Sequence, residues 1–220
     1  MKTAYPTSSD LSSRLTELGF DAEHIAALDL SYYATVGQQR FERATQRVFL
    51  SDTNVERSYV PPGNADHLLW IGDLASYTTV NYQSTPTSTA TTLTVNEDFE
   101  LLPLDAPDRS EPWRFVRFLE CYPHPRNQPP TPRYYITGKW AWGTSSTGFP
   151  EDAWEAMLLA SLITIVPIIG NRIVGPVTSW RQADVAKNFG DAPYNAVREA
   201  LRDVYMHTVT KYTATRPITC

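Results

Sequence analysis

The chain has 220 residues and a net charge of −5, enough for one domain with an appendage or for two small domains. The acidic balance and the lack of a basic run argue against a general nucleic-acid-binding protein, which needs a basic face. They leave room only for a small local basic patch.

Aromatic residues are abundant, with six Trp, twelve Tyr and eight Phe. Tyr and Trp are enriched at protein interfaces, although a β-rich core explains them equally well. The two cysteines, Cys121 and Cys220, are too few for a framework of several disulfides, so we expect a reduced, intracellular chain. The first residues contain no apolar signal region, so we expect no secretory signal.

The first part of the chain reads as helical. Asp10 is a candidate N-cap for a short helix that ends at Gly19, and Asp21 is a candidate N-cap for a second helix running from Ala22 to about Phe49. The polar face of this second helix includes a set of arginines. It is most simply a solvated face, and contact with a partner's acidic surface is the alternative. The set is Arg40, Arg43 and Arg47.

After Leu50 the apolar period changes from helical to alternating, and turn residues separate seven short runs. These runs predict a β region, in which two long polar or Pro-rich loops, 83–91 and 121–132, are either functional or disordered. The predicted strands are Val55–Val60, Leu68–Ile71, Ser76–Tyr82, Thr92–Val95, Phe99–Leu102, Trp113–Leu119 and Arg133–Lys139.

The stretch from Arg133 to Gly170 combines a predicted strand with an apolar helix, and we expect the remaining elements to pack around it. Its strand places Tyr134, Ile136 and Trp140 on one face, and Pro150 then suits the first turn of a helix. Residues 153–169 of that helix are apolar on almost every side, which predicts burial on every side. The run is too short and too interrupted for a membrane span, so we expect a neighbouring subunit to supply part of its cover.

The last third returns to helical patterns. Ser179 is a candidate N-cap for a helix over Trp180–Phe189, and Pro193 opens a second helix over Tyr194–Thr208. Residues 209–220, with Pro217 and many threonines, predict an extended tail that is disordered when alone.

Catalytic and metal-binding patterns are weak. The histidines are not paired at metal-ligand spacing, and Cys121 with His124 offers only two ligands. There is no phosphate-binding glycine loop, nucleophile elbow or zinc-protease helix. We therefore predict no catalytic residue, no cofactor and no metal. The histidines are His24, His67, His124 and His207.

Three short segments follow one another in the chain, Asn96–Pro103, Gly138–Gly143 and Phe149–Ala156. Their order resembles that in the head–tail connector (adaptor, or head-completion) proteins of tailed bacteriophages and gene transfer agents. Those proteins carry an Asn/Asp-Asp-Tyr/Phe-x-Leu strand, a strand that ends in a G-x-W/F-G-W-like motif, and a Val-Pro-Glu/Asp helix. The resemblance covers most of Leu11–Gly170, but Phe149 replaces the usual small aliphatic residue and the linker Thr144–Gly148 is long.

The resemblance implies a structural virion protein without enzymatic activity, located at the head–tail junction and assembled in the host cytoplasm. Such proteins form a ring, commonly of about twelve subunits, under the portal protein. The ring extends the channel through which DNA passes without sequence-specific binding, and it presents a platform for the next tail component. No membrane is involved.

The predicted fold is α+β, a helical bundle core with an inserted antiparallel β domain. The predicted parts are 1–54 (helical), 55–143 (β), 144–208 (helical) and 209–220 (tail). Portal contact is predicted at Tyr205, Tyr212 and Arg216, and subunit contact at Trp154, Leu158, Leu162, Arg40 and Arg47.

Two alternatives stay open. A β-rich tail or receptor/carbohydrate-binding module predicts tryptophans exposed in a shallow groove, whereas the connector prediction buries most of them. A hydrolase is the third alternative, for which the sequence suggests no substrate. The tryptophans concerned are Trp70, Trp113, Trp140 and Trp142.

Overall fold

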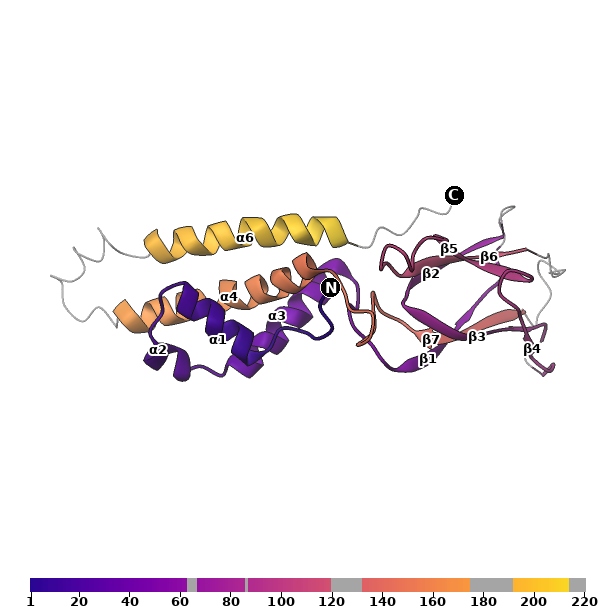
Figure 1. The fold of residues 1–220 in the computed structure, drawn as a ribbon, viewed down its shortest axis with the longest axis horizontal. Coiled ribbons are helices and arrows are strands. Elements are labelled where there is room, and N and C mark those ends of the chain that lie inside the picture. Colours follow the sequence, from indigo (N-terminus) through magenta and orange to yellow (C-terminus); the bar gives the residue numbers. More distant parts are fainter. Residues whose placement is uncertain (63–66, 86, 120–131, 175–191, 214–220) are drawn as a thin grey trace.

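A computed structural model describes residues 1–62, 67–85, 87–119, 132–174 and 192–213. Helices lie at one end of an elongated molecule and two antiparallel sheets at the other (Figure 1). The strands all fall between the helices of the two chain ends, so the predicted α+β class is confirmed.

Three helices form the N-terminal part: α1 (Ser8–Glu17), α2 (Ala22–Ala26) and α3 (Leu30–Thr45). The N-cap of α1 is Thr7, and Asp10 is its capping-box partner rather than the cap itself. The single helix predicted from Ala22 to Phe49 is wrong. Asp29 accepts a hydrogen bond from the backbone N–H of Tyr32 and starts α3 anew, and α3 ends where Gln46 takes a left-handed conformation.

Two long helices complete the helical part: α4 (Glu151–Val174) and α6 (Ala192–Tyr212). The helix predicted over 153–169 is confirmed as α4. The end of α6 differs from the prediction, because Val209–Tyr212 are helical rather than part of an extended tail. The helix predicted over Trp180–Phe189 and the residues after Thr213 lie outside the described residues.

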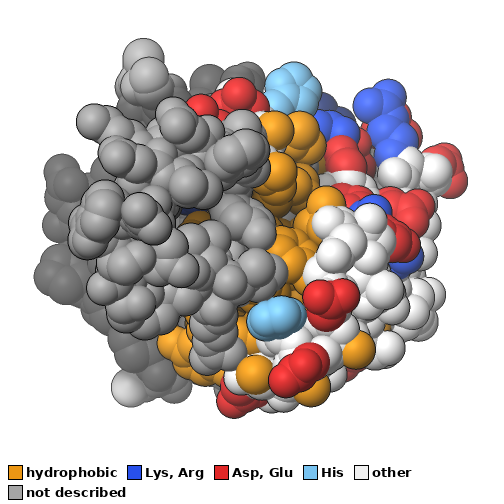
Figure 2. Space-filling view, turned by 90° about the vertical axis from the view of Figure 1, so that its left-hand side faces the viewer, with side chains coloured by type: hydrophobic (Ala, Val, Ile, Leu, Met, Phe, Trp, Pro, Cys, Tyr) orange, Lys and Arg blue, Asp and Glu red, His pale blue; other side chains and the backbone are white. Residues whose placement is uncertain are grey.

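Most of the cover for α4 comes from the chain itself. Helices α1, α2, α3 and α6 all pack against it, so a neighbouring subunit would have only the remaining part of its surface to cover, and that subunit contact stays a prediction. The prediction that this run is too short and too interrupted for a membrane span is wrong, because Glu151–Gly170 is long and apolar enough by length and composition. However, 61% of the stretch is buried within the chain, as in a core helix. Seen from the helical end, a band of hydrophobic side chains borders the part that is not described (Figure 2). The buried side chains of α4 are Ala153, Ala156, Met157, Leu158, Ala160, Ser161, Leu162, Ile165, Val166 and Ile169.

A glycine sets the distance between α3 and α4. A Cβ at Gly37 would lie 2.0 Å from Ser161 Oγ and 2.5 Å from the carbonyl oxygen of Met157. The same serine donates a hydrogen bond to the carbonyl of Tyr33 across the two helices (2.9 Å). The helices therefore touch backbone to backbone at this point.

Gly37→Ala is expected to lower the free energy of unfolding by about 1–3 kcal/mol, although alanine is the better helix former by about 1 kcal/mol. Urea denaturation followed by circular dichroism measures it. The exposed neighbour Gln39→Ala is the control, expected within about 0.5 kcal/mol of the parent. A stabilised Gly37→Ala variant would contradict the close packing.

Six of the seven predicted strands are present with shifts of up to three residues at their ends, whereas the fourth, predicted over Thr92–Val95, is observed only at Thr91–Thr92. They form two antiparallel sheets with strand orders β1-β7-β3-β4 and β2-β6-β5. The chain changes sheet four times, between β1 and β2, between β2 and β3, between β4 and β5, and between β6 and β7. The strands are β1 (Asn54–Tyr59), β2 (Leu68–Leu74), β3 (Ser76–Gln83), β4 (Thr91–Thr92), β5 (Phe99–Leu102), β6 (Trp113–Phe118) and β7 (Arg133–Lys139).

The two sheets share one apolar core. Along β7 the side chains alternate, so Tyr134 and Ile136 are fully buried, as predicted. Phe118 of the second sheet stacks on Tyr134 with ring centroids 3.8 Å apart. The loop 83–91 is held partly by Gln83, which donates to the carbonyl of Ser88 (2.7 Å); most of the loop 121–132 lies outside the described residues.

Candidate functional site

The two parts of the chain meet at an aromatic cluster. Phe49 is fully buried and lies in the segment that connects α3 to β1. Trp142 and Phe149 lie in the segment that connects β7 to α4. The two segments run side by side, since the N–H of Trp142 donates to the carbonyl of Val48 (2.8 Å). Phe49 stacks on Trp142 (centroids 5.9 Å, 12°) and meets Tyr212 of α6 edge-on (5.6 Å). One cluster therefore fixes the junction and the end of α6.

A nearly buried ion pair lies beside this cluster. Arg47, at the end of α3, contacts both carboxylate oxygens of Asp73 at the end of β2 (2.5 and 2.6 Å). The two side chains are only 9% and 12% exposed. Arg47 also donates to the carbonyl of Tyr212 (2.6 Å), and Arg114 of β6 lies 3.6 Å from Asp73. The carboxylate of Asp73 thus contacts Arg114 within its own sheet and Arg47 from the helical part, and so it links the two parts of the chain.

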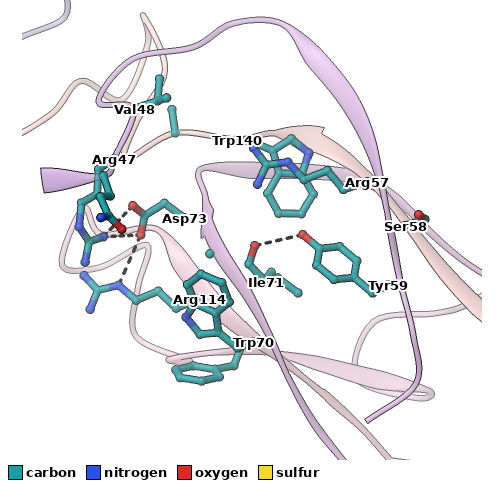
Figure 3. A pocket seen from close by; sticks show the side chains of 14 residues that line it. Arg47, Val48, Arg57, Ser58, Tyr59, Trp70, Ile71, Asp73, Arg114 and Trp140 are labelled. Atoms are coloured by element: carbon teal, nitrogen blue, oxygen red, sulfur yellow. Dashed lines mark hydrogen bonds and ion pairs between the residues drawn. The ribbon is translucent and has the colours of Figure 1, made fainter. Parts of the chain in front are cut away.

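A groove of about 810 Å³ opens next to these residues. It lies between β1 and β2, which are edge strands of their two sheets among the described residues (Figure 3). Arg57 lies over the ring of Trp140 (4.3 Å), and the hydroxyl of Tyr59 bridges the gap by donating to the carbonyl of Ile71 (3.0 Å). Trp70 and Phe115 add aromatic surface.

The chemistry of the groove is that of binding. Its lining holds three arginines and one carboxylate, and that carboxylate is engaged by Arg47 and Arg114, whereas Arg57 lies over Trp140. Guanidinium groups over aromatic rings bind carboxylates and other anions well. In the part of the chain that the structure describes, no three His, Cys, Asp or Glu side chains gather as a metal site. Cys121 and His124 lie outside that part.

The residues predicted for subunit contact do not form one surface. Leu158 and Leu162 are buried in the helical core of their own chain, and Arg47 is engaged in the junction. Trp154 is half-buried, with the ammonium of Lys2 4.3 Å from its ring centroid. Arg40 is exposed and donates to Thr164 of α4.

The residues predicted for portal contact also have intramolecular roles. Tyr205 of α6 is half-buried against Phe41 of α3 (centroids 6.2 Å). Tyr212 is only 4% exposed and donates to a carboxylate oxygen of Asp152 at the start of α4 (2.6 Å). Arg216 lies outside the described residues.

Asp152 locks the end of α6 to the start of α4. Burial alone would raise the pKa of its carboxyl group, but hydrogen bonds from Lys211 and Tyr212 outweigh burial and lower the pKa below its usual 3.8. Burial and the neighbouring Asp152 carboxylate raise the pKa of the Tyr212 hydroxyl. The tyrosine therefore stays a neutral donor at physiological pH.

The lock gives a testable dependence on pH. The folded state lowers the pKa of Asp152. The hydrogen bonds of its carboxylate with Lys211 and Tyr212 therefore stabilise the folded chain above the unfolded pKa, and this stabilisation is lost as pH falls through the folded pKa. Asp152→Asn is expected to lower stability at pH 7 and to lose less stability than the parent between pH 5 and 3. Urea midpoints measured across that range check this, with the exposed Asp203→Asn as control. Parallel pH curves for parent and Asp152→Asn would contradict the role of the carboxylate.

The exposure of Trp70, Trp113, Trp140 and Trp142 only partly distinguishes the connector from the binding module, which predicts exposed tryptophans. Trp140 and Trp142 are 5% and 7% exposed, and Trp70 and Trp113 are half-buried. Only Trp70 and Trp140 line the groove, where Arg57 covers the latter. No fully exposed tryptophan platform is present among these four.

The comparisons with known proteins concern the fold. No protein-family model and no curated protein matches the chain. One similar solved chain belongs to the neck of an empty GTA particle computed with C6 symmetry, with TM-score 0.55, 13% identity and coverage of 100% of this chain and 94% of that one. Another belongs to the virion of a native gene transfer agent (GTA) particle, with the same score and identity and 95% of that chain covered. At this identity the likeness shows a fold shared over the whole chain with GTA particle components.

Proposed function

We propose that the chain is a structural virion protein, a head–tail connector subunit in the neck of a phage-like particle. The observation that carries the proposal is the likeness in fold, along the whole chain, to a chain in the neck of a GTA particle. The motif order in Asn96–Pro103, Gly138–Gly143 and Phe149–Ala156 supports it independently. The role is structural and not enzymatic.

In this role the subunits form a ring of about twelve copies under the portal. The ring extends the DNA channel and provides the platform for the next tail component. A net charge of −5 suits a channel through which DNA slides, since a strongly basic lining would hold the phosphates. We place the portal contact at the chain end with Arg216, because Tyr205 and Tyr212 are engaged in the packing of α6.

The test is binding of the purified chain to the portal vertex of its own particle, with subunits counted by native mass spectrometry and electron microscopy. The expected result is a closed ring on the portal. A chain truncated after Thr213 keeps the Tyr212 lock and is expected to lose portal binding, and Arg216→Ala is expected to weaken it. A matched exposed change, Arg202→Ala on α6, is expected to have no effect.

The alternative is a β-rich tail or receptor/carbohydrate-binding module. The groove with Trp70, Trp140 and Arg57 is the observation that favours it. Binding of the chain to a glycan array or to host cells, without binding to the portal, would replace the connector proposal by this one.

A further inference from the structure

A rigid acidic turn projects from the β part. Residues 103–111, here called the acidic turn, are held by four backbone hydrogen bonds, among them Glu111 N–H to the carbonyl of Ala106 (2.9 Å). Ala106 is fully buried beneath the turn, whereas Leu104 is 65% exposed, the highest fraction among the large exposed apolar side chains described. Asp108 of the same turn is also exposed. Within the turn, Asp105 pairs with Arg109 (2.6 Å), and Glu111 lies 3.9 Å from Arg114. The turn thus offers one exposed apolar side chain and the carboxylate of Asp108, already ordered for contact.

The groove between β1 and β2 has the complementary chemistry. Trp70, Tyr59 and Phe115 give it apolar walls, and Arg57 and Arg114 place positive charge at those walls. Arg114 is shared between Asp73 (3.6 Å) and Glu111 of its own chain (3.9 Å). Among the described residues, no carboxylate lies within ion-pair distance of Arg57, which is therefore the groove arginine open to a partner's carboxylate. A leucine with a carboxylate nearby matches the apolar walls and the charge of Arg57.

The two features lie at the same level of the elongated molecule. The acidic turn contacts the junction, since Trp142 donates from its indole nitrogen to the carbonyl of Ser110 (3.2 Å). The groove is lined by Arg47 and Val48 of the same junction. Both therefore lie where the sheets meet the helices (Figure 1). Leu104 does not line the groove of its own chain, so the turn is available to another copy.

We propose that the acidic turn of one copy inserts Leu104 into the β1–β2 groove of the next copy, with Asp108 facing Arg57. The inference rests on the proposed ring function. It joins two different surfaces of identical chains, which is the head-to-tail contact that closes a ring by rotation. Two features at one level along the long axis meet when such copies stand side by side.

DNA is the competing occupant for a groove with arginines and aromatic rings. The second copy fits better, because DNA makes no use of the exposed Leu104, whereas the acidic turn presents an apolar side chain together with the carboxylate of Asp108. Charge and apolar surface are both matched by the acidic turn.

Cysteine crosslinking tests the contact. In a Cys121→Ser, Cys220→Ser background, one population carries Leu104→Cys and a second carries Ser58→Cys, at a residue lining the groove. Mixing both on the portal and oxidising is expected to give a disulfide dimer, which neither population forms alone. Ser145→Cys, on an exposed residue outside the groove, replaces Ser58→Cys in the control and is expected to give none.

Charge exchange is the second test. Asp108→Lys and Arg57→Glu are each expected to weaken ring assembly at least about tenfold, and the double variant is expected to restore it. Circular dichroism verifies folding of each variant, and Glu199→Lys on α6 is the control.

The outcomes separate the two proposals. Rings on the portal without the crosslink and without rescue would overturn this contact and leave the connector function standing. No ring and no portal binding by the parent chain would overturn the connector function itself. A groove in which Arg57→Glu abolishes binding of single-stranded DNA while assembly is unchanged would assign the groove to nucleic acid and overturn the proposal.

Discussion

Phe49→Ala is expected to lower the free energy of unfolding by about 3–5 kcal/mol. Phe49 is fully buried and its ring meets those of Phe41, Trp142 and Phe149 with centroids 5.1, 5.9 and 5.9 Å apart. Removing it leaves a cavity at the point where the chain passes from helices to sheets and back. The rigid relation between the two parts is then lost along with the stability.

Urea denaturation measures the loss, followed by tryptophan fluorescence because Trp142 stacks on Phe49. The neighbouring Val48→Ala is a matched control: its side chain is 45% exposed, and its effect is expected within about 0.5 kcal/mol. A loss for Phe49→Ala no larger than for the control would mean that the cluster does not hold the junction.

The sequence predicted the β part well because each strand carries its own evidence. Alternation in Arg133–Lys139 and the turn residues around Phe99–Leu102 depend only on neighbours along the chain. The helix after Pro150 was predicted from equally local signals, the proline itself and the apolar run that follows it. By contrast, the break between α2 and α3 was missed although Asp29 offered an N-cap, because the apolar period continues across it.

The junction could not be predicted from the sequence. Arg47 and Asp73 are 26 positions apart, and each fits a simple local explanation, a polar helix face and a turn. Only the tertiary arrangement shows that they meet. Tyr212 was likewise assigned to an extended tail, since its partners on α4 and at Phe49 lie far away in the sequence. The groove arginines Arg57 and Arg114 have no local signal that distinguishes them from ordinary strand residues.

The apolar circumference of α4 shows how far a local pattern reaches and where it stops. A helix apolar on all sides must be covered, and the sequence suggested a second subunit for part of that cover. In the structure, the chain's own helices provide most of it, and α6 lies along α4 for much of its length. We therefore place the proposed subunit contact at the junction, where Leu104 and the groove remain accessible.

Asp73→Asn tests whether the ion pair holds the two parts together. An amide in place of the carboxylate leaves the nearly buried guanidinium of Arg47 without its counter-charge, and removing one partner of a buried pair costs about 3–5 kcal/mol. Because Asp73 also faces Arg114 at 3.6 Å, the same change raises the positive charge of the groove. The expected result is a lower urea midpoint with a fold that is otherwise kept.

The exposed change Asp203→Asn controls for loss of a surface carboxylate and is expected within about 0.5 kcal/mol of the parent. The double variant Asp73→Leu, Arg47→Met removes both charges and is expected to recover part of the loss, since an apolar pair can replace a buried ion pair. If Asp73→Asn alone were as stable as the parent, the pair would be dispensable. The aromatic cluster around Phe49 would then hold the junction by packing alone.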